Sequence, residues 1–556
     1  MKINKKIMLL ALLPSFAVLS CKKELNVGNP NQPTIDLNVT TETGLIALTL
    51  GGVYSNGIGN GNLGWLGNSY ASLPYGYSEL LADMVSAEAA NQIVNIINIP
   101  DSYKLTPGGA SEANDAPMRT VIRTNNTRPS TAQGNNAFYY HWVANYSLNN
   151  ACNAVLSLVD AVSYTGNATV KKNTIRAFCY FWKGWAYANL GSQYYAALIS
   201  DEPSTTNGDY KVHDDIIAES NANFKKATDI LAAIPAGDAD YTSVLGQLIP
   251  SFTQVGNGGI LTPDMWKRNI NTMLARNILV NRLSPFVNNN PAASVTGTSM
   301  MAITAGDWTS ILALSGDGIR KGDKVFTARS ASVNGFMGAG AGSVSAQATG
   351  ASSPATFKIG ERFIQNFKAG DKRFTNNFAV DPYGMIATFS TRYNQIDGGK
   401  KTPGVYVYGN KNIGEYEAYL AGSYEENALM LAEANIRTGN IETGLGFVDD
   451  VRNYMGADIA AVKGTSLDLP KALSELVRER RVALVYRGLS YFDSRRWGWI
   501  YDVSKGGGAY GQTVVEGTTV YTNATINYNF LDYWDVPADE FDFNPASGNV
   551  AIKNPN

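Results

Sequence analysis

Side chains that commonly carry out catalysis are sparse in this chain of 556 residues, which contains two histidines. Neither His141 nor His213 lies in an HExxH motif or another zinc-ligand spacing. His213 precedes two aspartates at an expected helix start, so we expect a surface or capping role for it. No GxSxG motif and no Walker A motif occurs. Residues 59–64 match GxGxxG, but they follow no clear strand, and we interpret the match as chance.

Glycoside hydrolysis needs a pair of carboxylates on either side of the scissile bond. The chain contains 47 acidic residues, and no pattern singles out a pair. We therefore predict a protein that is not an enzyme, although the sequence leaves a glycan hydrolase open as an alternative.

Binding is better supported than catalysis, and sugars are one class of ligand to consider. Sites for sugars combine an aromatic surface, which packs on the C–H face of the ring, with polar groups that bond its hydroxyls. Aromatic residues with this potential lie in Gly-, Asn-, Ser- and Thr-rich segments, with one acid and one base nearby. The candidate ligand-binding residues are Trp65, Tyr75, Tyr77, Asp83, Tyr103, Arg123, Trp308 and Tyr393. Ordinary packing is the alternative for each of them, and it is the expected role of Trp182, Trp185, Trp266 and Trp497.

Hydrophobic periodicity predicts the elements that position these residues. Apolar residues recur at helical spacing over 144–160, 171–191, 213–233, 264–283, 424–437, 443–454 and 470–487. The first six are expected to pair in chain order, as in tetratricopeptide-type hairpins, although no fixed repeat length is present. Asp214 and Asp215 are candidate N-caps of the third helix. Small residues at Ala177, Gly184 and Ala188 would permit close helix approach.

The remaining segments are long and polar, and loops of this length are usually functional or contain short strands. We expect one domain over residues 41–556, mostly α-helical. The helical scaffold is predicted for roughly 41–55, 78–95, 140–285 and 424–500, and the less regular ligand-binding half for 56–77, 97–137 and 286–420.

The N-terminus has the pattern of an export signal. Lys2, Lys5 and Lys6 precede an apolar stretch over 7–19, which ends just before Cys21. This order predicts a signal peptide over residues 1–20, a lipid on Cys21 and an extended tether over 21–40. An ordinary cleaved signal, with Cys21 incidental, is the alternative. No later segment has the roughly 18 consecutive apolar residues of a membrane-spanning helix, so we expect attachment by lipid.

The charge and the other cysteines exclude further classes. The net charge is −2 and no long basic run occurs, which argues against nucleic-acid binding. Cys152 and Cys179 give no metal-ligand or redox spacing. They are expected to be buried free thiols, and a bridge between facing helices stays open. No cofactor or metal is predicted.

A series of motifs marks the C-terminal third of the chain. They are residues 429–439 (LMLAEANIRTG), 447–452 (FVDDVR), 476–484 (LVRERRVAL), 486–488 (YRG), 492–498 (FDSRRWG), 535–540 (DVPADE) and 544–545 (NP). Together with Cys21 and the following Asn29-Pro30-Asn31, their order and spacing resemble the SusD/RagB family of outer-membrane nutrient-binding lipoproteins.

The same residues have a physical interpretation of their own. Arginines and carboxylates alternate with aromatics over 479–497, which predicts an Arg–carboxylate lattice that packs helices together. A ligand site is the alternative for this cluster. Glu433 and Arg437, four residues apart, are expected to pair on a helix surface.

The resemblance implies a SusD-like fold: tetratricopeptide-like helix pairs carrying a loop-rich half that holds the ligand. It also implies a lipoprotein on the outside of the outer membrane, acting with a TonB-dependent transporter of the SusC class. The expected ligand is an oligosaccharide, with peptide binding of the RagB type as the alternative. A purely structural helical-repeat scaffold is a further alternative.

Overall fold

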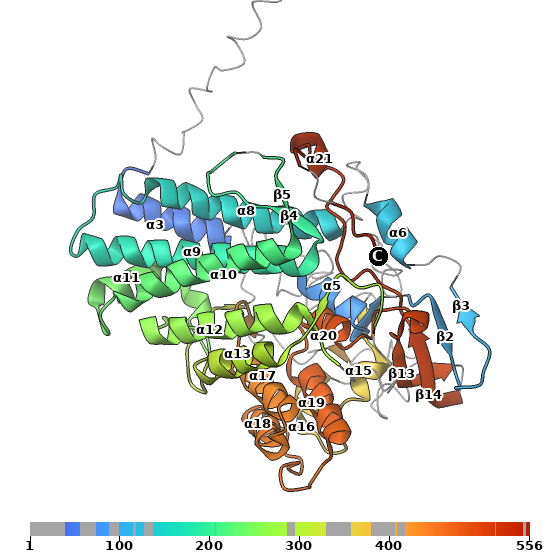
Figure 1. Cartoon of the computed structure of the whole chain (residues 1–556). Helices are drawn as coiled ribbons and strands as arrows, with labels where there is room; N and C mark the ends of the chain where they lie inside the picture. Colours follow the sequence, from blue (N-terminus) through green and yellow to red (C-terminus); the bar gives the residue numbers. More distant parts are fainter. Residues whose placement is uncertain are drawn as a thin grey trace, which may run out of the picture.

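The computed structural model describes residues 39–55, 74–87, 99–114, 118–126, 137–205, 207–285, 295–329, 357–379, 406–407, 417–516, 519–548 and 552–556. Helices stack side by side through most of this part of the chain, and a small antiparallel sheet lies at one end (Figure 1). Cys21, Trp65 and Tyr393 lie outside the described residues, and so do the predicted signal peptide and most of the tether.

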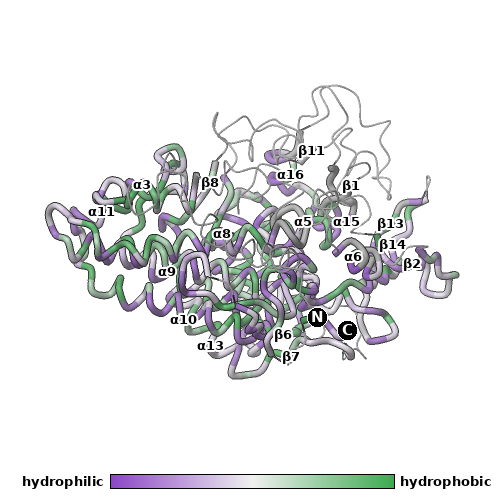
Figure 2. Tube along the Cα trace, turned by 90° about the horizontal axis from the view of Figure 1, so that it is seen from above, coloured by the Kyte–Doolittle hydropathy of each residue, from purple (hydrophilic) through white to green (hydrophobic). Residues whose placement is uncertain are grey.

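The first helical layers follow the predicted pairing. Helix α8 (Ala137–Leu158) packs beside α9 (Ala168–Gln193), and α3 (Glu42–Leu50), which continues as a π-turn over Gly51–Ser55, contacts both. The Asn167 side chain caps α9 by accepting a 3.2 Å hydrogen bond from the Val170 amide. Apolar and polar residues alternate along these helices in the hydropathy view (Figure 2).

The helices of the second predicted pair pack against more neighbours than the sequence predicts. Helix α10 (His213–Ala232) contacts α12 (Pro263–Val280), but its more extensive packing is against α9. The unpredicted α11 (Ala239–Leu248) also packs on α9. The expectation that Asp214 and Asp215 cap α10 is wrong, because Val212 is the N-cap. Both aspartates lie in the first turn instead, where the helix dipole favours negative charge.

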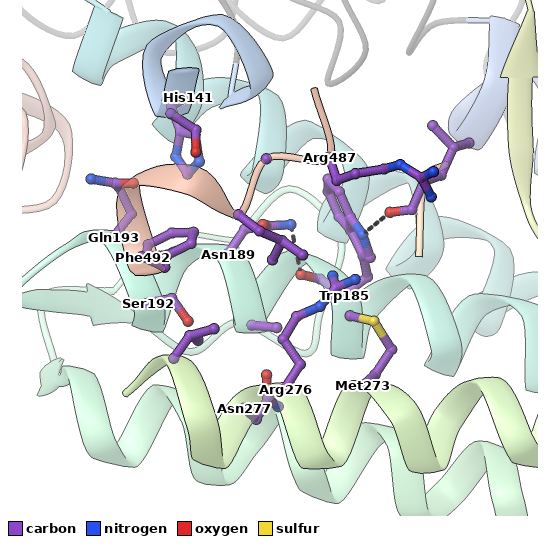
Figure 3. A pocket seen from close by; sticks show the side chains of 16 residues that line it. His141, Trp185, Asn189, Ser192, Gln193, Met273, Arg276, Asn277, Arg487 and Phe492 are labelled. Carbon is purple, nitrogen blue, oxygen red and sulfur yellow. Dashed lines mark hydrogen bonds between the residues drawn. The ribbon is translucent and has the colours of Figure 1, made fainter. Parts of the chain in front are cut away.

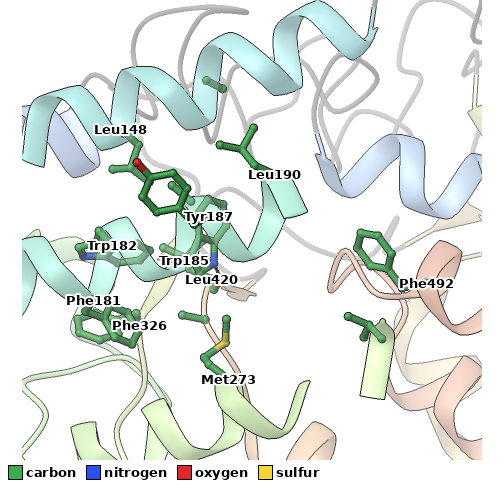
Figure 4. Close-up of a cluster of buried hydrophobic side chains, with 14 of the residues drawn as sticks. Leu148, Phe181, Trp182, Trp185, Tyr187, Leu190, Met273, Phe326, Leu420 and Phe492 are labelled. Carbon is green, nitrogen blue, oxygen red and sulfur yellow. Dashed lines mark hydrogen bonds between the residues drawn. The ribbon is translucent and has the colours of Figure 1, made fainter. Parts of the chain in front are cut away.

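Close contact between α9 and α10 depends on a small residue, as expected. A Cβ atom at Gly184 would lie 2.7 Å from the Phe224 ring. The aromatic core beside it packs edge to face: Trp182 and Phe326 have ring centroids 5.3 Å apart (Figure 4). Cys152 and Cys179 lie in the same buried cluster as free thiols, and burial raises the pKa of Cys179.

The segment 286–420, expected to be irregular, contains a well-formed helix. Helix α13 (Ala305–Gly316) packs between α12 and α17 (Tyr424–Arg437). Thr304 and Asp307 form a reciprocal capping box at its start. This capping pattern can be recognised in the sequence. Helix α13 is one layer of the helix stack in a segment where the sequence predicts loops.

Helices near the C-terminal end agree with the motifs. Helix α17 pairs with α18 (Ile441–Tyr454), followed by α19 (Leu469–Ala483) and α20 (Ser490–Arg496). Periodicity predicts a helix to residue 487, but α19 ends at Ala483, and Tyr486 has a left-handed φ of 60°.

The main sheet joins distant parts of the chain. Its antiparallel order is β13 (Ala509–Glu516), β14 (Thr519–Asn527), β2 (Ser102–Lys104) and β3 (Glu112–Ala113). The other pairs are β1 (Val85–Ala87) with β9 (Phe357–Ile359), β4 (Ala196–Leu198) with β5 (Tyr210–Val212), β6 (Arg282–Leu283) with β7 (Met301–Ala302), β8 (Thr327–Arg329) with β12 (Glu417–Tyr419), and β10 (Phe378–Ala379) with β11 (Tyr406–Val407). The short helices are α5 (Pro74–Leu81), α6 (Met118–Asn125), α15 (Glu361–Ile364), α16 (Lys372–Asn377) and α21 (Glu540–Phe543).

The predicted Arg–carboxylate lattice is present and buried. Arg480 and Arg496 both bond the Asp493 carboxylate, and Arg496 also bonds Glu433. These contacts join α17, α19 and α20. The expectation of a surface pair between Glu433 and Arg437 is wrong in its location. The two groups lie 3.9 Å apart, but both side chains are buried, and Glu433 also pairs with Arg496.

Candidate functional site

Both histidine side chains are buried and pack against other parts of the chain. His213 begins α10 and stacks on Tyr533, with ring centroids 4.0 Å apart and an angle of 11° between the ring planes. It is buried, so the expected surface role is wrong. His141 is buried in α8, and burial lowers the pKa of its imidazole to about 3. The His141 ring therefore stays uncharged and packs as part of the core.

Two of the sequence-predicted ligand residues lie beside the end of β14. Asp83 has a left-handed φ of 56° and is buried, and its carboxylate bonds the Arg362 guanidinium and the Tyr528 hydroxyl at 2.7 Å. Tyr103 on β2 pairs with Ile526 of β14 and is half-buried. Burial and the Glu516 and Glu112 carboxylates raise its pKa.

The other described candidates lie elsewhere. Arg123 bonds the Asp535 carboxylate at 3.0 Å and the Asn554 carbonyl at 2.5 Å. Trp308 is only 7% exposed, packed between helices in the α13 layer. Tyr75 and Tyr77 belong to α5, and the structure does not describe the positions of their side chains. The described candidates therefore do not form one cluster.

A narrow crevice separates α9 and α12 from the segment before α20 (Figure 3). Trp185 donates a 2.7 Å hydrogen bond to the Leu420 carbonyl at one side, and Arg276 on α12 forms a two-point ion pair with Glu426. The cavity volume is about 40 Å³. One water molecule needs roughly 10–15 Å³ of cavity volume, so the crevice has room for a few waters and not for a sugar.

A second, open pocket is large enough for a small molecule. Its volume of about 390 Å³ falls within the range of ligand sites, roughly 300–1,000 Å³. It lies between α8, the connection from β4 to β5, and α21. Its lining combines aromatic, amide and hydroxyl side chains: Trp142, Val143, Tyr146, Ser147, Asn149, Asn150, Leu198, Ser200, Ser204, Thr205, Asn207, Glu540 and Asn544.

Helix α8 supplies one wall. Trp142, Tyr146 and Asn149 follow one another at intervals of four and three residues, which places them on one helix face. The Tyr146 hydroxyl donates to the Leu198 carbonyl at 2.8 Å and accepts from the Leu198 amide at 2.6 Å. The Asn149 amide donates to the Ser200 carbonyl at 2.9 Å. These bonds fix the loop after β4 against the helix.

The C-terminal segment supplies the opposite wall. The Glu540 carboxylate accepts a 2.7 Å hydrogen bond from the Trp142 indole and another from the Asn544 side-chain amide. The Tyr210 hydroxyl donates to the Asn544 carbonyl at 2.9 Å. A Cβ atom at Gly208 would lie 1.9 Å from the Pro545 carbonyl oxygen, so only glycine allows this approach.

Two acceptor atoms in this pocket lack donors. The Oδ1 atoms of Asn149 and Asn544 are buried and have no hydrogen-bond partner among the described residues. Asn149 is only 2% exposed. Buried polar atoms are almost always bonded, so these two oxygens are exceptions, and because both are solvent-inaccessible they are not open to a ligand in the pocket.

Sequence reasoning did not find this pocket. Residues 142–149 fall within the segment predicted as scaffold, and Glu540 and Asn544 within family motifs. One signal was available: Asn145, Asn149 and Asn153 recur at four-residue intervals on a buried helix face. Asparagine is unfavourable inside helices and uncommon in cores, so such a row indicates a special role.

Comparisons with known proteins identify the fold. No family model matches the chain, and no curated protein matches it. A solved structure of a proposed sugar-binding protein from Bacteroides vulgatus matches over 92% of this chain and 98% of its own, with TM-score 0.55 and 16% identity. A SusD superfamily protein from the same organism matches over 90% and 97%, with TM-score 0.53 and 16% identity. A SusD superfamily protein from Bacteroides thetaiotaomicron matches over 90% and 98%, with TM-score 0.51 and 13% identity. The resemblance stated from the motifs is thus confirmed at the level of structure, and the chain has the SusD-like fold.

Proposed function

We propose that this protein captures an oligosaccharide nutrient at the cell surface and delivers it to a TonB-dependent outer-membrane transporter. It binds its ligand without transforming it. The observation that carries the proposal is an open pocket lined by aromatic, amide and hydroxyl groups, on a fold shared with a proposed sugar-binding protein.

The lining of the pocket supports binding over hydrolysis. Glu540 is the single carboxylate among its described lining residues. Glycosidases place two carboxyl groups about 5–10 Å apart across the scissile bond. One carboxylate already bonded by Trp142 and Asn544 does not supply the acid and nucleophile of that mechanism.

The N-terminal sequence supports the surface location. The basic, apolar and cysteine segments in order predict a lipid on Cys21. The resemblance to the SusD/RagB family implies that the lipid holds the protein on the outside of the outer membrane. Among the described residues, no helix combines the length and apolar character needed to cross a membrane.

Calorimetry on the lipid-free chain, with residues 1–20 removed and Cys21→Ser, tests capture directly. The chain is titrated with glycan and peptide panels, and each sample is checked for products. We expect binding to one glycan class without turnover, weakened by Tyr146→Ala at the open pocket. Tyr103→Ala tests the sequence-predicted position as a parallel variant. Binding of peptides alone would replace the oligosaccharide with a peptide, and turnover would contradict the binding role.

The transporter partner has a separate test. Gentle detergent extraction of the lipidated protein from outer membranes is expected to co-purify a large β-barrel protein. Recovery as a free monomer only would contradict a stable complex, and it would leave ligand capture unaffected.

A further inference from the structure

The charge of the open pocket sets which sugars it accepts. Among the described lining residues, Glu540 is the one acidic side chain, and none is a lysine or an arginine. Its carboxylate is held in place by N–H donors from Trp142 and Asn544, which bond it as an acceptor. A fixed negative charge therefore forms part of the wall, close to any ligand that fills the cavity.

The ammonium group of Lys183 does not neutralise this charge. Lys183 is buried beneath the β4–β5 connection, where it bonds the Asp201 carboxylate at 2.8 Å and the Asn153 side chain. Its charge is thus already balanced. Glu202, on the same connection, is exposed and is not among the lining residues.

The exposed hydrogen-bonding groups of the lining are uncharged. Ser147, Ser204 and Thr205 are exposed lining residues, and their hydroxyls both donate and accept hydrogen bonds. Sugar hydroxyls are suitable partners for such groups, and none of the three supplies a positive charge to an acidic sugar. Half-buried Tyr146 offers apolar surface inside the pocket. Phe543, 64% exposed on the same short helix as Glu540, offers an aromatic ring outside it.

We propose that this pocket binds an uncharged sugar unit through its hydroxyl groups and discriminates against acidic sugars. This inference rests on the proposed function and specifies its substrate class. Two like charges a few ångströms apart at a protein surface repel strongly enough to change affinity by about tenfold or more at low salt.

Matched ligand pairs test the discrimination by calorimetry on the lipid-free chain. Each pair shares a backbone and differs in charge: methyl-esterified and free oligogalacturonate, xylo-oligosaccharide and its glucuronic-acid-substituted form, lactose and sialyllactose. The neutral member is expected to bind at least about tenfold more tightly in 20 mM salt, with the ratio falling as salt is raised.

Variants assign the effect to the pocket. Glu540→Gln is expected to reduce the preference for the neutral member by about tenfold. The matched control Glu202→Gln removes the same charge from an exposed position outside the lining and should change the ratio less than about twofold. Thr205→Lys, at an exposed lining position, adds a positive charge and should raise affinity for the acidic member, even if Glu540→Gln fails to fold.

Ser147→Trp locates the binding event, because a bulky ring at this exposed lining residue of α8 obstructs the pocket and should weaken neutral-glycan binding. Neutral binding that survives Ser147→Trp would overturn the assignment of the pocket and leave glycan capture standing. Tighter binding of the acidic members, or equal effects of Glu540→Gln and Glu202→Gln, would overturn the discrimination. Binding of peptides with silence across all glycan pairs would overturn both the inference and the proposed function.

Discussion

Arg496 and Glu433 form a two-point ion pair inside the protein, with Nη1–Oε1 and Nη2–Oε2 distances of 2.7 Å and both side chains fully solvent-excluded. Burial alone would raise the pKa of the Glu433 carboxyl, but the opposing effect of the Arg496 charge and its hydrogen bonds is larger, so the pKa is lowered. The pair joins α17 to α20, and Asp493 extends it to Arg480 on α19.

Removing one side of this pair should destabilise the fold. Glu433→Ala leaves the Arg496 guanidinium buried with only Asp493 to balance it, and breaking a buried pair in this way costs about 3–5 kcal/mol. Urea denaturation followed by circular dichroism measures the change in unfolding free energy. The control is Asp229→Ala, which breaks an exposed pair with Lys225 and should cost less than about 1 kcal/mol. Equal effects of the two variants would contradict the structural role of the lattice.

His141 should make the protein acid-sensitive. Its pKa is about 3 in the folded chain, compared with an ordinary value of 6.5, because burial disfavours the charged ring. The unfolded chain therefore takes up a proton that the folded chain refuses. Stability is lost as pH falls from about 6.5 towards 3, by up to about 1.4 kcal/mol per pH unit. His141→Gln should flatten this slope in urea denaturations from pH 7 to 4. An unchanged slope would show that the buried histidine is not its source.

Glu79 should give a pH dependence of folding stability opposite to that of His141. Burial raises the pKa of its carboxyl to about 8, against the opposing effect of hydrogen bonds from Ser490. The folded chain thus holds a proton that the unfolded chain loses near pH 4.5. The stability this contributes is present below pH 4.5 and is lost as pH rises through about 8. Glu79→Gln keeps a neutral group of the same shape, so the gain in unfolding free energy over wild type should grow from pH 5 to pH 8. A variant less stable than wild type at pH 8 would contradict this.

Asp83 should contribute to stability more than to ligand affinity. Its carboxylate bonds Arg362 and Tyr528 in the interior, and Asp83→Asn would remove the negative charge that pairs with this buried arginine. We expect a loss of about 3 kcal/mol in unfolding free energy. Glycan affinity, measured by calorimetry at a temperature where the variant is folded, should stay within about twofold of wild type. A large loss of affinity with unchanged stability would instead place Asp83 in the ligand site.

Periodicity and motifs predicted much of the scaffold and little of the site. Helices α9, α10 and α17 were recognisable because single apolar faces recur along them, and the lattice because its arginines and acids lie near one another in sequence. Helix α13 was missed because its neighbourhood is rich in glycine and serine, although Thr304 and Asp307 signal its start. Trp308 was placed in a loop for the same reason. The open pocket could not be predicted, since Tyr146 and Glu540 come together only through tertiary packing.

The Trp142–Glu540 hydrogen bond joins residues 398 positions apart. In the main sheet, Tyr103 pairs with Ile526 across a comparable interval. During synthesis or export the N-terminal end of the chain emerges first. Helix α8 and strand β2 are therefore present before Glu540 and β14, with which they pair. Closing loops of this length is entropically costly and slow compared with forming neighbouring helix pairs. The helical stack should therefore assemble early and the pocket late, which makes the onset of ligand binding a kinetic marker for the completion of folding.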